Sequence, residues 1–217
     1  MDSGAKKILD NLKSRKYEPV YVLQGEETYY IDLISNYIES NVLTDAERGF
    51  NQVIVYGKDV TVSAILTHAR RFPMMAERQV VIVKEAQDIV DLQKEEGAKM
   101  LLDYLKRPVP STLLVLCHMH KSFDKRKELG KKIEQLTESA TFKKPKDNEL
   151  GNFIQEYVAG REFTMDDRAK QVLAEYVGND LNRLANEIDK VIINTPRGQS
   201  ITADLVMAHV GIDRKSV

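Results

Sequence analysis

The sequence has a single cysteine and no long uninterrupted apolar segment. Cys117 has no second cysteine with which to form an internal disulfide, which fits a reducing compartment. No apolar run approaches the about 18–20 residues that a membrane-spanning helix needs. Residues 1–7 lead into a polar helix rather than the apolar core of a signal peptide. We therefore expect a cytoplasmic protein with no membrane partner.

Neither sign of charge dominates the chain, because its formal net charge is only -1. The whole molecule therefore does not look like a nucleic-acid binder. Residues 121–146 nevertheless contain nine basic and four acidic side chains, a local charge of +5 that leaves -6 for the rest. Helical spacing, as between Glu128 and Lys132, favours a solvated helix face. The alternative is a contact with phosphate, whose candidate residues are Lys121, Lys125, Arg126, Lys127, Lys131 and Lys132.

The turn at residues 24–28 lacks the residues that bind phosphates. Such a turn after the first strand is where doubly wound sheets usually hold a phosphate. A P-loop would need G-x-x-x-x-G-K-[ST], whereas this turn offers Gly25 without a lysine. Glu26 and Glu27 would repel a polyphosphate there, although carboxylates suit the first turn of a helix. Lys84 stands where a magnesium-binding acid should follow the strand. We expect no bound nucleotide and no catalytic residue.

Histidine and cysteine are too sparse to predict a metal site. His118 and His120 are two residues apart at a predicted strand end, so they could point to one face, with Cys117 on the opposite face. A zinc site needs three or four ligands, and the chain supplies no obvious further partner. We therefore predict no metal, and we expect Cys117 to pack as a small core residue.

Alternating strand and helix patterns predict an α/β domain with a parallel sheet. Apolar runs predict buried strands at 20–23, 53–56, 80–83 and 113–116, with a weaker candidate at 140–142. Helical patterns lie between them at 29–42, 62–70, 97–106 and 125–138. This order is typical of a doubly wound fold with helices on both faces of the sheet.

The pattern becomes helical after the charged, proline-bearing stretch 143–146, which reads as a linker. We expect domains at 1–143 and 144–217, the second small and all-helical. Its first predicted helix covers 147–158. Thr164 and Asp167 form a capping-box-like pair before a second helix that ends at Val177, and a last short helix runs from Thr202 to Val210. Between the last two, a helix starts after 178–180 with one apolar stripe, made by Leu181, Leu184, Ile188 and Ile192.

Two adjacent methionines stand on a short connection before the strand at 80–83. Pro73 ends the preceding helix, and Met74 and Met75 follow it. A tight connection has little room to bury both side chains, and exposed methionine suits a surface that binds a partner. The alternative is that both fill the core beneath the neighbouring helix, which this segment alone slightly favours.

Four segments together resemble the delta subunit of the bacterial DNA polymerase III clamp loader. They are PVYVLQGEE at 19–27, FPMMAERQVVIV at 72–83, KSFDKR at 121–126 and GNDLNRLANEIDK at 178–190. The resemblance implies an AAA+-like α/β domain without ATP binding, a small helical lid-like domain and a third, collar domain. Because the sequence stops at Val217, we expect that the collar domain is absent and that the chain is part of a longer subunit.

The resemblance also implies a function and a site. Members of this family act in DNA replication: they bind and open the ring-shaped sliding clamp as non-catalytic subunits of the DNA-directed DNA polymerase holoenzyme. The implied partners are the sliding clamp (beta subunit), the other clamp-loader subunits including its ATPases, and primer-template DNA. The clamp-binding positions that match are Met74 and Met75, flanked by Phe72 and Pro73. Many relatives carry leucine or an aromatic residue at the matching pair. The resemblance makes exposure of at least one methionine the favoured prediction.

Three other functions remain as alternatives. The chain could be an AAA+ ATPase with a degenerate P-loop, which ATP binding would reveal. It could be a stand-alone DNA-binding module using its basic segment, which tight, salt-sensitive binding would reveal. The weakest is a metal-dependent hydrolase using His118 and His120, which stoichiometric zinc would reveal.

Overall fold

The computed structural model describes residues 1–210, which fall into two compact units. Residues 2–143 form an α/β unit, and a mainly helical unit begins at Lys144. No helix among residues 1–210 is both long and apolar enough to cross a bilayer.

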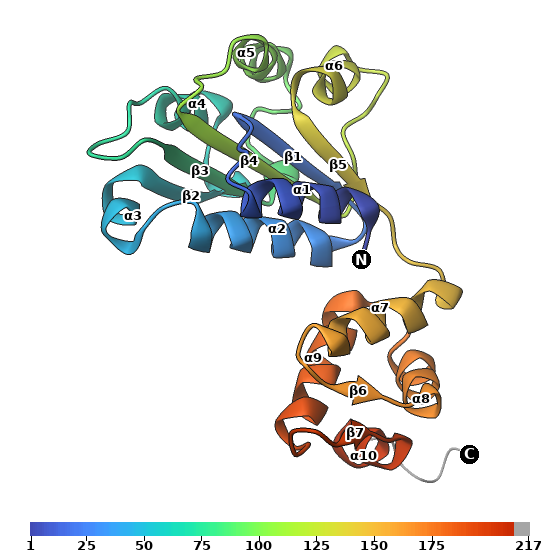
Figure 1. Ribbon diagram of the computed structural model, residues 1–217. Coiled ribbons are helices and arrows are strands. Elements are labelled where there is room, and N and C mark those ends of the chain that lie inside the picture. Colours follow the sequence, from blue (N-terminus) through green and yellow to red (C-terminus); the bar gives the residue numbers. More distant parts are fainter. Residues whose placement is uncertain (211–217) are drawn as a thin grey trace. The chain divides into compact units, whose positions relative to one another are not determined.

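Five parallel strands form the centre of the α/β unit, in the spatial order β2-β3-β4-β1-β5 (Figure 1). All four predicted strands and the weaker fifth candidate are confirmed as strands, but burial of residues 53–56 was wrongly predicted, because β2 lies at the edge of the sheet and none of its residues is buried. β3 shows why their runs are apolar throughout: residues 80–83 are all fully buried, because both faces of the sheet are covered. The strands are β1 (Val20–Gly25), β2 (Gln52–Tyr56), β3 (Gln79–Lys84), β4 (Thr112–Met119) and β5 (Glu138–Phe142).

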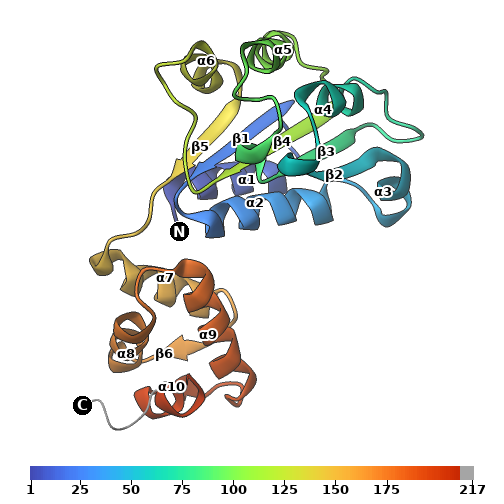
Figure 2. The ribbon, with the colours of Figure 1, turned by 180° about the vertical axis from the view of Figure 1, so that it is seen from behind.

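Helices cover both faces of this sheet, as predicted (Figures 1 and 2). One face carries α1 (Ser3–Lys13) and α2 (Thr28–Asn41). The other carries α4 (Val62–Ala69), α5 (Glu95–Lys106) and α6 (Glu128–Leu136). Apolar side chains of these three helices pack with alternate residues of the strands into one core, for example Leu66 with Val81 and Leu116. Short 3-10 turns follow two strands: η1 (Gly57–Asp59) and η2 (Ala86–Asp88).

Two elements of the α/β unit differ from the prediction. α3 (Asp45–Asn51) was not foreseen, because it is short and has no apolar periodicity; Glu47 caps it by accepting the Thr44 backbone N–H at 2.8 Å. The helix expected at 125–138 begins only at Glu128 and ends at Leu136. Its expected first residues form a turn in which Asp124 accepts the Arg126 backbone N–H at 2.9 Å. Glu138, expected to be helical, belongs to β5.

The second unit contains four helices among the described residues, together with a pair of very short parallel strands that the sequence analysis did not foresee. The helices are α7 (Asp147–Ala159), α8 (Asp167–Val177), α9 (Leu181–Ile193) and α10 (Ala203–His209). The strands are β6 (Thr164–Met165) and β7 (Ser200–Ile201). The predicted stripe of α9 is buried at Leu181, Leu184 and Ile188. Ile192 is only half-buried, and Val191 takes its place in the core.

The start of α8 corrects one prediction. Thr164 does not cap this helix, because it lies in β6. The cap is Asp166, whose carboxylate accepts the Ala169 backbone N–H at 2.6 Å.

Candidate functional site

Residues 70–78, the methionine loop, connect α4 to β3. The loop carries three exposed large apolar side chains: Phe72 is 84% exposed, Met74 55% and Met75 fully exposed, while Pro73 is half-buried. In Figures 1 and 2 this connection projects beyond the edge of the sheet that carries β2. The prediction that at least one methionine is exposed is confirmed. Its role in binding a partner stays a prediction.

Asn51, the last residue of α3, attaches the first half of this loop to the body of the unit. Its side chain is buried and makes hydrogen bonds to both polar groups of the Met74 backbone. The Asn51 Oδ1 accepts the Met74 N–H at 2.6 Å, and Nδ2 donates to the Met74 carbonyl at 2.9 Å. Nδ2 also donates to the Glu47 carbonyl at 3.1 Å. Buried, fully bonded amides of this kind hold a segment in one conformation.

Gln79 attaches the other end of the loop. This buried residue opens β3, and its side-chain amide donates to the carbonyl of His68, in the last turn of α4, at 2.5 Å. Its backbone N–H donates to the Ser111 carbonyl at 2.8 Å. The Arg78 guanidinium lies 5.1 Å from the centre of the Tyr17 ring, a cation–π contact. The methionine loop is therefore fixed at both ends, and its apolar side chains face outward.

The Met75 backbone has a positive φ of 53°. A residue with a β-carbon loses about 1–2 kcal/mol in this left-handed conformation, so neighbouring contacts must maintain it. The two hydrogen bonds from Asn51 to the preceding residue are such contacts. Sequence reasoning missed Asn51; the available signal was an asparagine at the point where a polar segment enters a strand.

The turn after β1 is filled by the chain itself. Gly25 has φ 128°, and a β-carbon there would lie 2.1 Å from the Phe142 carbonyl oxygen. The Glu27 side chain is buried, and its carboxylate accepts the Tyr29 N–H at 2.9 Å, so it occupies the first turn of α2. Its backbone N–H donates to the Phe142 carbonyl. A carboxylate therefore stands where a P-loop would hold phosphate.

Lys84 ends β3 at the position that an acid occupies in magnesium-dependent nucleotidases. Its ammonium donates to Ser35 Oγ at 3.0 Å and to Asn36 Oδ1 at 3.2 Å, and Glu39 lies 3.7 Å away. The lysine thus joins the sheet to α2. A cation at this point opposes, rather than assists, the binding of a metal ion.

Of the residues considered for metal binding, Cys117 and His118 are in the core, whereas His120 is exposed. Cys117 is fully buried, and burial raises the pKa of its thiol to about 12. His118 is also buried; its Nδ1 lies 2.8 Å from the Lys121 carbonyl and its ring packs on Phe123. Burial lowers the pKa of His118, which favours the neutral ring. Within residues 1–210, no group of three or more potential ligands (His, Cys, Asp or Glu) is placed to hold a metal ion.

The candidate basic residues lie between β4 and the end of α6, and several already have partners. Lys125 pairs with Glu134 at 2.5 Å, and Arg126 pairs with Asp124 at 2.9 Å and holds the pKa of that carboxyl at about 2. Lys127 and Lys132 donate to glutamine side chains. Among the described residues, Lys121 and Lys131 have no side-chain partner. These contacts are typical of a solvated helix face, and they favour that interpretation of the basic segment over a contact with phosphate.

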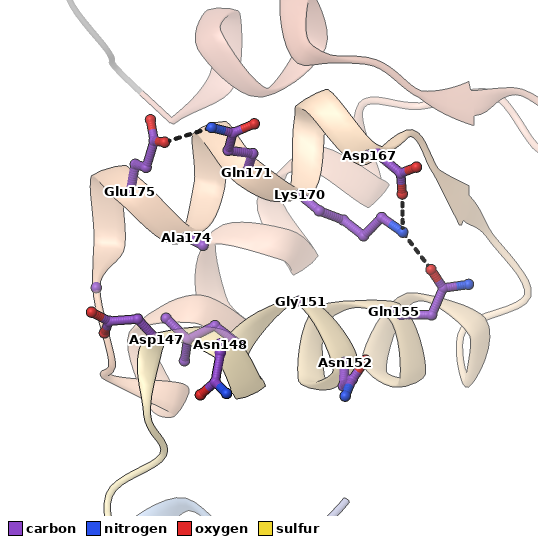
Figure 3. Close-up of a pocket in the computed structure, with 12 residues that line it drawn as sticks. Asp147, Asn148, Gly151, Asn152, Gln155, Asp167, Lys170, Gln171, Ala174 and Glu175 are labelled. Carbon is purple, nitrogen blue, oxygen red and sulfur yellow. Dashed lines mark hydrogen bonds and ion pairs between the residues drawn. The ribbon is translucent and has the colours of Figure 1, made fainter.

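A groove of about 790 Å³ lies between α7 and α8 in the second unit. Figure 3 shows that polar side chains on its walls pair with one another. Lys170 donates to Asp167 at 2.7 Å and to Gln155 at 2.6 Å, and Gln171 donates to Glu175 at 2.8 Å. These pairs engage five of the polar side chains that line the groove, while Asp147, Asn148 and Asn152 are exposed to solvent. The methionine loop is therefore the better-supported site.

Comparison with solved structures first defines the class of fold. The Thermotoga maritima RuvB Holliday junction branch migration motor matches with a TM-score of 0.52 at 13% identity, over 96% of this chain and 68% of that chain. At such low identity the likeness shows the fold alone. The chain has an AAA+-like fold, with a parallel α/β unit followed by a helical unit.

The family is narrower than this class. The model of the DNA polymerase III delta subunit family matches residues 21–144, more than half of the chain. The chain therefore belongs to the DNA polymerase III delta subunit family. It is similar to the DNA polymerase III subunit delta of Bacillus subtilis (strain 168), with 26% identity over 201 residues. The solved Bacillus subtilis DNA clamp loader delta protein matches with a TM-score of 0.73 at 25% identity, over 95% of this chain.

This chain is shorter than both of these relatives. It spans 58% of the Bacillus subtilis subunit and 62% of the chain in the solved clamp loader delta protein.

Proposed function

We propose that this chain binds the sliding clamp of the bacterial replication machinery and helps to open its ring, acting without catalysis as part of a clamp loader. The observation that carries the proposal is the exposure of Met74 and Met75 on a fixed loop, in a chain of the delta subunit family. Both methionines insert into an apolar pocket of the clamp. The other proposed partners are the ATPase subunits of the loader and primer-template DNA, in the cytoplasm.

Two methionines can provide enough binding free energy for such an anchor. Fully burying one methionine side chain contributes about 1.5–3 kcal/mol, so the pair contributes roughly 3–6 kcal/mol before ordering costs. Those costs are reduced, because Asn51 already holds the backbone of the loop. Binding opens the ring only to the extent that the open clamp is bound more tightly than the closed one.

The alternative of an active ATPase is disfavoured by two side chains. Glu27 fills the first turn of α2 and Lys84 replaces the metal-binding acid. The negative charge of Glu27 weakens the binding of a triphosphate, and the positive charge of Lys84 weakens the binding of its magnesium ion. Titration with a fluorescent ATP analogue tests this alternative, and saturable binding at micromolar concentration supports it.

The variant Met74→Ser with Met75→Ser tests the proposal. We expect clamp binding to be lost, because the apolar anchor is gone, while the fold persists, because both side chains are exposed. The measurement is titration of the chain with the sliding clamp of the same organism, with thermal denaturation as the check on folding. Unchanged clamp affinity in the double variant contradicts the proposal.

A further inference from the structure

Exposed large apolar side chains are concentrated on one part of the α/β unit. Seven such residues belong to this unit among those described, and six of them lie between residues 50 and 75. Three are in the methionine loop. The other three are in α3 and β2: Phe50 is 69% exposed, Ile54 38% and Tyr56 50%. A concentration of exposed apolar side chains marks an interaction site more often than scattered single residues do.

Phe50 lies beside the methionine loop. It immediately precedes Asn51, whose side chain is bonded to the Met74 backbone at 2.6 and 2.9 Å. Consecutive Cα atoms are about 3.8 Å apart, so the Phe50 backbone is within about one side-chain length of that junction. Two segments that are far apart in the sequence therefore lie next to each other, and each carries exposed apolar side chains.

The edge strand continues this surface. β2 is the outermost strand of the sheet and pairs with β3. Val55 packs into the core shared with α4, so Ile54 and Tyr56, which alternate with it, project from the other face. α2 lies against that face over the inner strands, and α3 stands beside β2 in both views of the ribbon (Figures 1 and 2). The exposed fractions of Ile54 and Tyr56 agree with incomplete cover at this edge.

We propose that the junction of α3 with β2 is the second half of the clamp-binding surface, with Phe50 as a further anchor and Asn51 as a positioning residue for the methionine loop. The proposal rests on the function proposed above and commits to the same partner. Phe50 directly precedes the residue that is hydrogen-bonded to the Met74 backbone, so a partner that covers the methionines comes close to its exposed ring. Asn51 does not touch the partner; it fixes the Met74 backbone and so directs the two methionine side chains outward.

The role of Phe50 is tested by Phe50→Ser, with Ile193→Ser as the matched control. Ile193 is 82% exposed and lies in α9 of the other unit. Clamp affinity of the whole chain is measured by titration, together with the double methionine variant. We expect Phe50→Ser to weaken binding at least tenfold and Ile193→Ser to leave it unchanged.

The outcomes separate the two proposals. Loss of binding in the methionine variant with wild-type affinity in Phe50→Ser overturns the second anchor and leaves the proposed function intact. Wild-type affinity in both variants overturns the proposed function and the second anchor together, as does failure of the unaltered chain to bind the clamp. A tenfold effect in the Ile193→Ser control also overturns the claim that Phe50 acts through a local contact.

The role of Asn51 is tested by Asn51→Asp, which can still accept the Met74 N–H but cannot donate to the Met74 carbonyl. We expect faster amide hydrogen exchange in the methionine loop, at least fivefold weaker clamp binding and a lower urea midpoint, because the buried carboxylate would face the Met74 and Glu47 carbonyl oxygens. If Asn51 acts through the methionines, the same change has a smaller effect in a Met75→Ala background, a coupling that a purely structural role does not produce. Equal effects in both backgrounds, or unaltered exchange in the loop, overturn the positioning role.

Discussion

Gly25 illustrates how one residue shapes the turn after β1. Its φ of 128° is one that side chains rarely allow, and a β-carbon would collide with the Phe142 carbonyl. The turn is thus closed by β5, and the Glu27 carboxylate fills the start of α2. The missing P-loop lysine therefore matters less than the contacts that fill this turn, namely the close approach of β5 to Gly25 and the Glu27 carboxylate at the start of α2.

We predict that Gly25→Ala destabilises the α/β unit by about 2 kcal/mol or more, because the backbone strain and the collision add. The measurement is urea denaturation. The matched control is Gly151→Ala in α7, where a β-carbon meets nothing within 4 Å. Alanine there should add up to about 1 kcal/mol, because it favours a helix over glycine. Equal stability of the two variants contradicts the prediction.

Two buried groups predict a loss of stability at alkaline pH. Burial raises the pKa of Cys117 and of Tyr21 to about 12 each, because it disfavours the charged forms. In the unfolded chain these groups ionise near their ordinary pKa values, about 8.5 and 10. The unfolded chain loses these protons at lower pH than the folded chain does. The contribution of the two groups to the free energy of unfolding is therefore complete below about pH 8.5 and declines as pH rises towards 12.

Urea denaturation from pH 8 to 11 measures this decline. We expect the free energy of unfolding to fall across the range and the Cys117→Ala variant to fall less steeply between pH 9 and 10. Stability that stays constant to pH 11 is incompatible with the buried, neutral thiol and phenol.

The elements of the second unit depend on capping residues at their starts. α8 begins after Asp166, although Thr164 also matches a capping pattern. The structure decides between them because the short pairing of β6 with β7 takes Thr164 out of the helix. A strand of two residues gives no periodicity from which it could be predicted.

We predict that Asp166→Ala lowers stability by about 1 kcal/mol, because it removes the acceptor of the Ala169 N–H. Thr164→Ala serves as the control and should change stability by less than about 0.5 kcal/mol, since this exposed residue does not cap α8. The readout is thermal or urea denaturation followed by circular dichroism. A larger loss for Thr164→Ala than for Asp166→Ala contradicts the assigned start of α8.

At the scale of the whole molecule, charge sets how DNA can be bound. The chain has a net charge of -1, and ion pairs already engage Lys125 and Arg126. Four of the six candidate basic side chains thus lack an acidic partner among the described residues. We therefore expect any contact of this chain with primer-template DNA to be weak.

We predict weak binding of the isolated chain to duplex primer-template DNA. The slope of log affinity against log salt should be no steeper than about -4, since each phosphate contact contributes about 0.9. This slope is measured by fluorescence anisotropy at salt concentrations from about 50 to about 200 mM. Lys121→Glu with Lys131→Glu should halve the slope. Tight binding with a slope near -8 supports the stand-alone DNA-binding alternative instead.

The class of fold could be predicted from the sequence pattern. Exposure of at least one methionine was expected only through the family resemblance, because the pattern of its own segment slightly favoured burial. The buried strands could be read because a parallel sheet covered on both faces needs continuous apolar runs, as at residues 80–83. The repulsion that Glu26 and Glu27 would exert on a bound polyphosphate could also be predicted, because it depends only on residues that are neighbours in the sequence. α3 could not be read, since its few polar residues carry no repeating pattern.

Only the tertiary structure decided what stands beside the methionines. Asn51 and Met74 are 23 residues apart, and their hydrogen bonds exist because two adjacent strands begin at the same edge of the sheet. The exposure of Ile54 and Tyr56 likewise follows from the edge position of β2 rather than from their local sequence. Hydrophobic patterning reports which residues avoid water, but the identity of their spatial neighbours depends on strand order, which no local pattern encodes.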